Sequence, residues 1–247
     1  MSRFDAPSTP SWRRKTLMIA AVAAVVAPVA AFAAIYLLFF NNDSPAPLIL
    51  STGTPPASGT PVSAAGLPGE WSVAEGSIAG YRVREKLARL PAQSDGVGRT
   101  SAVTGTVTID AGAGGALVMN AASLEVDVTR LESDEGRRDR RIRTDGLESD
   151  QFPTAAFVAD APIELPAEAT TGASVTLNAT GALTIHGVTK TVTIPIQARL
   201  NGAIIELVGS ITFPFADFGM TPPSIGDFVQ VEDNATMEFQ VFLAKAG

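Results

Sequence analysis

The segment Ser133–Phe157, SDEGRRDRRIRTDGLESDQFPTAAF, is the one part of the chain where helical, charge-dense sequence interrupts strand-like sequence. Two acidic residues follow Ser133, a candidate N-cap, and five arginines lie beyond them, so the charges match the direction of a helix dipole. Leu147 and Phe152 give the following piece an apolar side, and Pro153 ends it before a new strand begins at Ala155. The segment therefore predicts a short helical lid that joins two strands.

Apolar and polar residues alternate with a period of two on both sides of this segment, as is typical of half-buried β-strands. The alternation predicts about eight strands, in the ranges 81–83, 103–109, 124–128, 157–163, 175–179, 192–198, 204–213 and 237–243. His186 and Gly187 lie between two of them and predict a hairpin turn. Closing an antiparallel sheet of this size hides its edges, so we expect an all-β antiparallel barrel.

The interior of an eight-stranded barrel is either just filled by side chains or just wide enough for one small ligand. Small residues recur at candidate inward positions, among them Gly105, Ala179 and Ala235, whereas large aromatic residues cluster late in the chain. This distribution favours a cavity over a filled core.

Three sequence blocks occur in an order that points to a family. The first is RDRRIRT at 138–144 with FPTAAF at 152–157, the second is LTIHGVTK at 183–190, and the third is DFGM at 217–220 with IGD at 225–227. Together they resemble the signature of the YceI-like, lipocalin-like proteins, over about residues 71–244. The resemblance implies an elongated, lipocalin-like antiparallel barrel with a helical lid. The chain departs from the family at Arg140 and Arg141, where a histidine is frequent.

The same resemblance implies a polyisoprenoid or another long-chain lipid as the ligand. Family blocks and inward alternation positions together suggest these binding residues: Tyr81, Val83, Ile142, Phe152, Phe157, Ala179, Ile185, His186, Phe218, Met220, Phe228 and Phe239. His186 has two interpretations, a turn residue hydrogen-bonded to backbone or a residue that guards the mouth of the cavity. The arginines are either a solvated helix face or, through Arg137 or Arg141, a contact for an acidic or phosphate-like head group.

The beginning of the chain predicts a membrane anchor. Residues 1–15 form a short polar tail, and no charged residue occurs in the 24 positions from Leu17 to Phe40. At 1.5 Å per residue such a run reaches about 36 Å, against a hydrocarbon core of about 30 Å. We therefore expect a transmembrane helix at 16–40, and the basic residues before it place the N-terminus in the cytoplasm. The alternative, a cleaved signal peptide, has a shorter apolar region of about 7–15 residues.

A segment rich in Pro, Ser and Thr follows at residues 41–69. Its few large apolar residues bury too little surface to offset the entropy of ordering, so we expect a flexible linker there. The barrel domain is expected at 70–247. The whole chain is thus predicted to be a single-pass cell-membrane protein with an extracytoplasmic C-terminal domain.

Composition and motifs argue against several functions. The chain has no Cys and one His, so a thiol nucleophile is absent and a zinc site lacks ligands. It also has no G-x-S-x-G, H-E-x-x-H or G-x-x-x-x-G-K-[ST] motif, so we expect neither enzyme activity nor a cofactor. The first 69 residues hold four of the 18 basic and two of the 25 acidic groups, so the remainder is acidic and no nucleic-acid partner is expected.

These observations predict a non-enzymatic, membrane-tethered protein that holds a long-chain apolar lipid inside its barrel for transport, storage or sensing. A homodimer is compatible with this prediction. The alternative is a filled barrel that acts at the cell surface as a protein-interaction or sensor domain without a lipid ligand.

Overall fold

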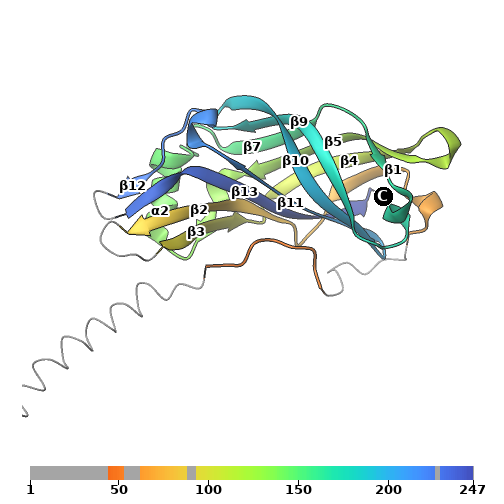
Figure 1. Cartoon of the computed structure of the whole chain (residues 1–247), viewed down its shortest axis with the longest axis horizontal. Coiled ribbons are helices and arrows are strands. Elements are labelled where there is room, and N and C mark those ends of the chain that lie inside the picture. The colour runs from red at the N-terminus through yellow and green to blue at the C-terminus, as the bar shows by residue number, and fades with distance from the viewer. Residues whose placement is uncertain (1–43, 53–61, 88–92, 226–228, 247) are drawn as a thin grey trace, which may run out of the picture. The chain divides into compact units, whose positions relative to one another are not determined.

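Strands dominate the part of the chain that the computed structural model describes, which comprises residues 44–52, 62–87, 93–225 and 229–246 (Figure 1). The predicted tail at 1–15 and the predicted transmembrane helix at 16–40 lie outside these residues. Among the described residues, no helix is long and apolar enough to cross a membrane.

The elements follow one another as a series of strands with short helical turns between them. In chain order they are η1 (Ala64–Gly66), β1 (Gly69–Val73), β2 (Ile78–Leu87), β3 (Gln93–Thr100), β4 (Val103–Ala111), η2 (Ala113–Gly115), β5 (Leu117–Asp127), η3 (Val128–Arg130), β6 (Glu132–Ser133), α2 (Gly136–Arg141), η4 (Ile142–Gly146), β7 (Thr154–Ala159), β8 (Ile163–Leu165), η5 (Ala167–Thr170), β9 (Val175–Ile185), β10 (Val188–Asn201), β11 (Ile204–Phe213), η6 (Phe215–Phe218), β12 (Ser224–Ile225) and β13 (Val229–Lys245).

Eight of these strands form a closed antiparallel ring, in the order β1-β4-β5-β7-β9-β10-β11-β13. Pairing of β1 with β13 closes the ring, with Trp71 opposite Lys245. The 17-residue strand β13 pairs with β11 along one edge and with both β1 and β2 along the other. Strands β2, β3 and β6 therefore extend the wall beside residues 229–240 of β13. The predicted all-β antiparallel barrel with a short helical segment is confirmed.

The hairpin between β9 and β10 shows how the sequence determines this wall. His186 and Gly187 form its two-residue turn, with φ angles of 51° and 71°. Two successive positive φ angles are what a type I′ turn requires, and this turn matches the twist of the strands. Along β9, Val175, Ala179 and Leu183 are buried, and threonine or asparagine occupies each alternate position except Ala182. The alternation therefore separates an apolar inner face from a polar outer face.

The predicted strand at 157–163 is two strands in the structure. Strand β7 pairs with β5 and β9, whereas β8 pairs with the opposite end of β5. Residues 160–162, Asp-Ala-Pro, separate the two strands. Pro162 has no backbone N–H to donate to a ladder, so the chain leaves the sheet there.

Ser133, predicted as the N-cap of the helix, does not cap it in the structure. The backbone of Ser133 pairs with Gly98 of β3, and its hydroxyl donates to the carboxylate of Asp139 at 2.6 Å. Glu135 caps the helix instead, because its carboxylate accepts the backbone N–H of Arg137 at 2.9 Å. The helix α2 thus starts later than predicted, has six residues, and continues into one π-type turn, η4.

Parts of the segment predicted as a linker at 41–69 belong to the same compact unit as the barrel, which begins at Ser44. Leu67 is 3% exposed within the core, and its carbonyl accepts the indole N–H of the fully buried Trp71 at 2.9 Å. The N–H of Val62 donates to the carbonyl of Gly202. Gly202 and Trp71 thus give the segment contacts with the barrel that its own composition does not show. These contacts offset the entropy cost of ordering the segment.

Close approach of β7 and β9 requires a glycine at position 181. A Cβ there would press into the carbonyl oxygen of Val158 and lie 2.7 Å from the ring of Phe157. We expect Gly181→Ala to lower the free energy of unfolding by about 1–3 kcal/mol, measured by urea denaturation. Gly136→Ala is the matched control, because nothing lies within 4 Å of that position, and it should stabilise the protein by about 0.4–1 kcal/mol. Equal unfolding midpoints for the two variants would contradict this account of the packing.

Candidate functional site: an apolar cavity inside the barrel

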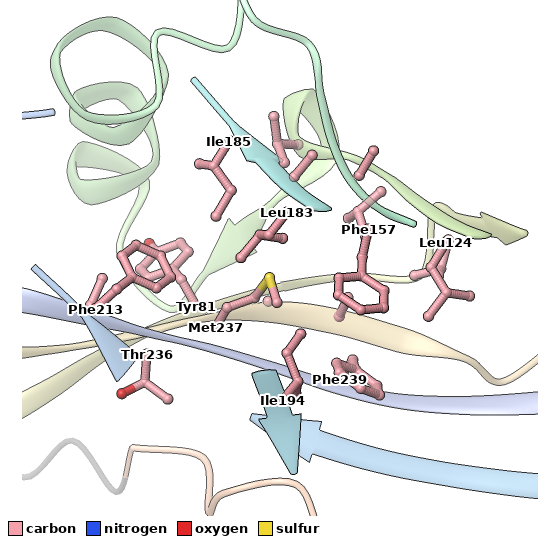
Figure 2. A pocket seen from close by; sticks show the side chains of 18 of the residues that line it. Tyr81, Leu124, Phe157, Leu183, Ile185, Ile194, Phe213, Thr236, Met237 and Phe239 are labelled. Atoms are coloured by element: carbon pink, nitrogen blue, oxygen red, sulfur yellow. The ribbon is translucent and has the colours of Figure 1, made fainter. Parts of the chain in front are cut away.

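The barrel encloses an apolar cavity with a volume of about 140 Å³ (Figure 2). Its lining comes from all the ring strands except β1, together with β2, the lid and the loop after β11. The strands contribute their inward positions, and the lid contributes Ile142 and Leu147. Apart from Tyr81 and Thr236, every lining residue is apolar. The alternation of the strands therefore collects one continuous apolar surface.

Most of the described residues that the sequence suggested for binding lie on this surface. Those lining the cavity are Tyr81, Val83, Ile142, Phe157, Ala179, Ile185, Met220 and Phe239. Phe152, His186 and Phe218 lie elsewhere, and Phe228 falls outside the described residues. Several lining residues were not predicted, including Leu183, Ile194 and Met237. Their signal was present, because Leu183 lies four positions after Ala179 and so faces the same side of β9.

His186 connects three segments behind the cavity. Its Nδ1 is 3.2 Å from the carbonyl oxygen of Phe218, and its Nε2 is 3.1 Å from the carboxylate of Glu148. Its ring packs against that of Phe152, with centroids 4.4 Å apart. Both polar partners offer acceptor oxygens, so a ring nitrogen that carries a proton can donate to the oxygen it faces. His186 thus joins the end of the lid to the β9–β10 turn and to η6, and it does not line the cavity.

Phe218 and Phe152 have packing roles that their place in the family blocks did not reveal. Phe218 is 1% exposed and meets the ring of Phe213 edge-on, with centroids 4.7 Å apart. Phe152 covers the β9–β10 turn, where a Cβ on Gly187 would lie 2.7 Å from its ring. Both aromatic rings therefore pack against elements that surround the cavity, and neither ring lines it.

The lid is held to the barrel by one largely buried ion pair. Arg138 donates to both carboxylate oxygens of Glu85 on β2, at 2.8 and 3.2 Å, and also pairs with Asp134. Only 12% of the Arg138 side chain and 16% of the Glu85 side chain are exposed. Arg141 pairs instead with Asp145 inside the segment and remains exposed. The arginine run is thus a solvated face with one anchoring member.

Tyr81 brings the one hydroxyl donor of the lining that has no protein partner. Among the described residues, its Oη is a buried polar atom without a hydrogen bond. The ring lies across Gly98 of β3, where any Cβ would collide with it. Burial raises the pKa of the hydroxyl, so it stays protonated and able to donate. The lining therefore includes one protonated hydroxyl that has no partner among the described residues.

A second apolar cavity, of about 60 Å³, continues the interior toward the other end of the barrel. It shares three lining residues with the first cavity, Val107, Met119 and Leu207. The sequence did not predict this cavity, because Leu67, Leu165 and Ala169, which also line it, lie outside the predicted strands. The three shared side chains are therefore the partition between two apolar chambers.

Two solved structures are similar to the chain at low sequence identity. A polyisoprenoid binding domain from Saccharophagus degradans is 14% identical with a TM-score of 0.52, and the alignment covers 72% of this chain and 98% of that chain. BcnA from Burkholderia cenocepacia is 24% identical with a TM-score of 0.48, over 66% of this chain and 95% of that chain. The first of these structures supports the same fold.

Sequence comparison supplies the family. No curated protein matches the chain significantly. The family model described as a YceI-like domain matches residues 78–242, which is more than half of the chain and contains most of the cavity lining. The chain therefore belongs to the YceI-like family.

Proposed function

We propose that the barrel binds a long-chain apolar lipid of the isoprenoid type and acts as a non-enzymatic carrier, store or sensor for it. The observation that carries the proposal is the cavity, which every ring strand but β1 lines with apolar side chains. An apolar cavity offers water no partners, whereas an apolar chain gains about 25 cal/mol per Å² of surface removed from water. The Saccharophagus degradans domain of the same fold is described as polyisoprenoid-binding, which supports this ligand class.

The proposal includes the location. The charge-free run from Leu17 to Phe40 and the basic residues before it support a membrane anchor with the barrel outside the cytoplasm. A barrel tethered to a bilayer has its lipid source close by, and its ligand need not cross bulk water.

The donor of Tyr81 supports an orientation for the ligand. Strand β13 places Met237 opposite Tyr81, and its later inward residues Phe239 and Val241 line the cavity further along. A lipid whose terminal hydroxyl, carbonyl or phosphate accepts from Tyr81 would extend its chain past these residues toward the partition at Met119. The ligand is thus proposed to carry one polar end and a chain whose length the partition limits.

The first test measures whether the purified protein carries lipid. An organic extract should contain a long-chain lipid, and delipidated protein should take up polyprenol in native mass spectrometry. Ala179→Phe should abolish uptake while keeping the thermal midpoint near that of delipidated wild type, because Ala179 lines the cavity. Thr180→Phe is the control, since Thr180 is exposed on the other face of β9. A wild type without lipid uptake and an early-melting Ala179→Phe variant would instead support the filled-barrel interaction domain.

The second test concerns the polar end of the ligand. Tyr81→Phe should weaken binding of a polyprenol by about 0.5–1.5 kcal/mol, the net contribution of one hydrogen bond, and leave binding of the matching hydrocarbon unchanged. The delipidated variant should be at least as stable as wild type, because the change removes a buried donor that has no partner. Equal losses for both ligands would show that the ring, and not its hydroxyl, contributes to binding.

The third test concerns chain length. Met119→Ala should join the two cavities, so the longest polyprenol retained in native mass spectra should increase relative to wild type. Met119→Leu nearly conserves the side-chain volume and should leave the length limit unchanged. If wild type binds lipid but the limit is the same in both variants, the partition at Met119 does not set chain length.

A further inference from the structure

The outer face of the barrel carries two buried carboxylates, which is unusual for outward positions of a strand. Glu206 on β11 is fully buried, and Glu238 on β13 is 2% exposed. Glu206 pairs with Arg199 of β10 at 2.7 Å, and Glu238 pairs with Arg99 of β3 at 2.7 Å. Buried carboxylates need such partners and need a cover that excludes water. The cover here is not part of the sheet.

Residues 44–51, SPAPLILS, provide the cover, and we call them the strap. In Figure 1 the strap is the orange segment that runs along the outside of the barrel past β2 and β13. The strap is not a β-strand. It is hydrogen-bonded to five strands, through the side chains or backbone of Asp95, Arg99, Arg82, Gln240, Glu206 and Arg199.

One end of the strap is held at Ser51. Its backbone N–H and its hydroxyl both donate to Glu206, at 2.6 and 2.7 Å. Its carbonyl accepts from Arg199 at 2.7 Å, and Gln240 donates to the carbonyl of Ile49 at 3.2 Å. Burial raises the pKa of Glu206, but the hydrogen bonds from Ser51, Gln240 and Arg199 lower it by more, so the carboxylate remains charged beneath the strap.

The other end is held through backbone carbonyls. Arg82 donates to the carbonyl of Pro45 at 2.6 Å, Arg99 donates to the carbonyl of Ala46, and the hydroxyl of Ser44 donates to the carbonyl of Asp95 at 2.6 Å. Arginine side chains that bind carbonyls recognise a stretched backbone, and they do not depend on the side chains of the bound segment. Within the strap, Ile49 is 66% exposed, so its apolar side chain adds little to the contact.

We infer that this outer face is a docking groove for a stretched, proline-containing peptide and that the strap is its intramolecular ligand, which can be released without unfolding the barrel. The groove is built from charged side chains of strands that the closed ring already holds in place. The strap contributes hydrogen bonds but no strand pairing, so its removal breaks no sheet ladder.

Docking of the strap shortens the free chain before the barrel. If the apolar run ends in a membrane at residue 40, three residues precede the docked strap, which reach at most about 11 Å at 3.6 Å per residue. With the strap released, the 21 residues from 41 to 61 are free and reach at most about 75 Å. Docking would therefore set how far the anchored domain can move from its lipid source.

The test uses the full chain in detergent and a labelled peptide of residues 44–52. Wild type should show slow hydrogen exchange at the Ser51 amide and should bind no peptide, because the tethered strap occupies the groove at a high effective concentration. Ser51→Pro removes the two donors that Ser51 contributes to Glu206, so residues 44–52 should exchange at the rate of the free peptide and the labelled peptide should now bind. Thr52→Ala is the control and should behave as wild type, because Thr52 is exposed.

A second variant examines the groove side. Glu206→Gln should release the strap and also fail to bind the peptide, while its circular dichroism stays that of wild type. Fast exchange at Ser51 in wild type, or no peptide binding by Ser51→Pro, would overturn the proposal. Protection that appears only at high protein concentration would also overturn it, because the strap would then come from a second copy.

Discussion

The structure depends on the pairing of one long strand, β13, along both of its edges. Because β13 pairs with β11 on one side and with β1 and β2 on the other, the ring closes and no ring strand is left with a free edge along its whole length. Alternate residues of the same strand then face opposite sides. Met237 and Phe239 line the apolar cavity, while Glu238 and Gln240 belong to the outer groove. One period-two pattern thus builds two chemically different surfaces back to back.

The strands were predictable from the sequence because alternation along each strand determines which side chains face inward. The polar contacts between distant segments were not predictable in this way. Ala179 and Phe157 were predicted to face inward, because alternation is a local property of each strand. His186 and Phe218 were chosen from family blocks that lie in turns, where no periodicity indicates which way a side chain points, and both support the wall from behind. Motif membership identified important residues without distinguishing a lining role from a supporting one.

The strap was missed for a related reason. Its composition, rich in proline and nearly free of charge, is that of a segment which cannot bury enough surface to order itself. Its partners supply the missing energy, yet the contact of Ser51 with Glu206 joins residues 155 positions apart. The local sequence shows that ordering the strap costs conformational entropy. It does not show the distant side chains whose hydrogen bonds offset that cost. The same holds for Leu67, whose burial depends on Trp71 and on the closure of the ring.

The interior of the barrel has one end beneath the lid and another end at the pairing of β1 with β13. The two ends differ in how many contacts must break to open them. At the far end, Trp71 and Leu243 are buried within paired strands, so opening there would break the ladder between β1 and β13. At the end that the lid covers, the lid has only the two-residue strand β6 in the sheet. It is otherwise held by the apolar side chains of Ile142 and Leu147, the ion pair of Arg138 with Glu85 and the contact of His186 with Glu148. Local opening follows the path that breaks the fewest cooperative contacts. For the lipid proposed above, entry into the barrel would therefore be least costly beneath the lid, where the hydroxyl of Tyr81 also lies within the influence of the Arg138 charge.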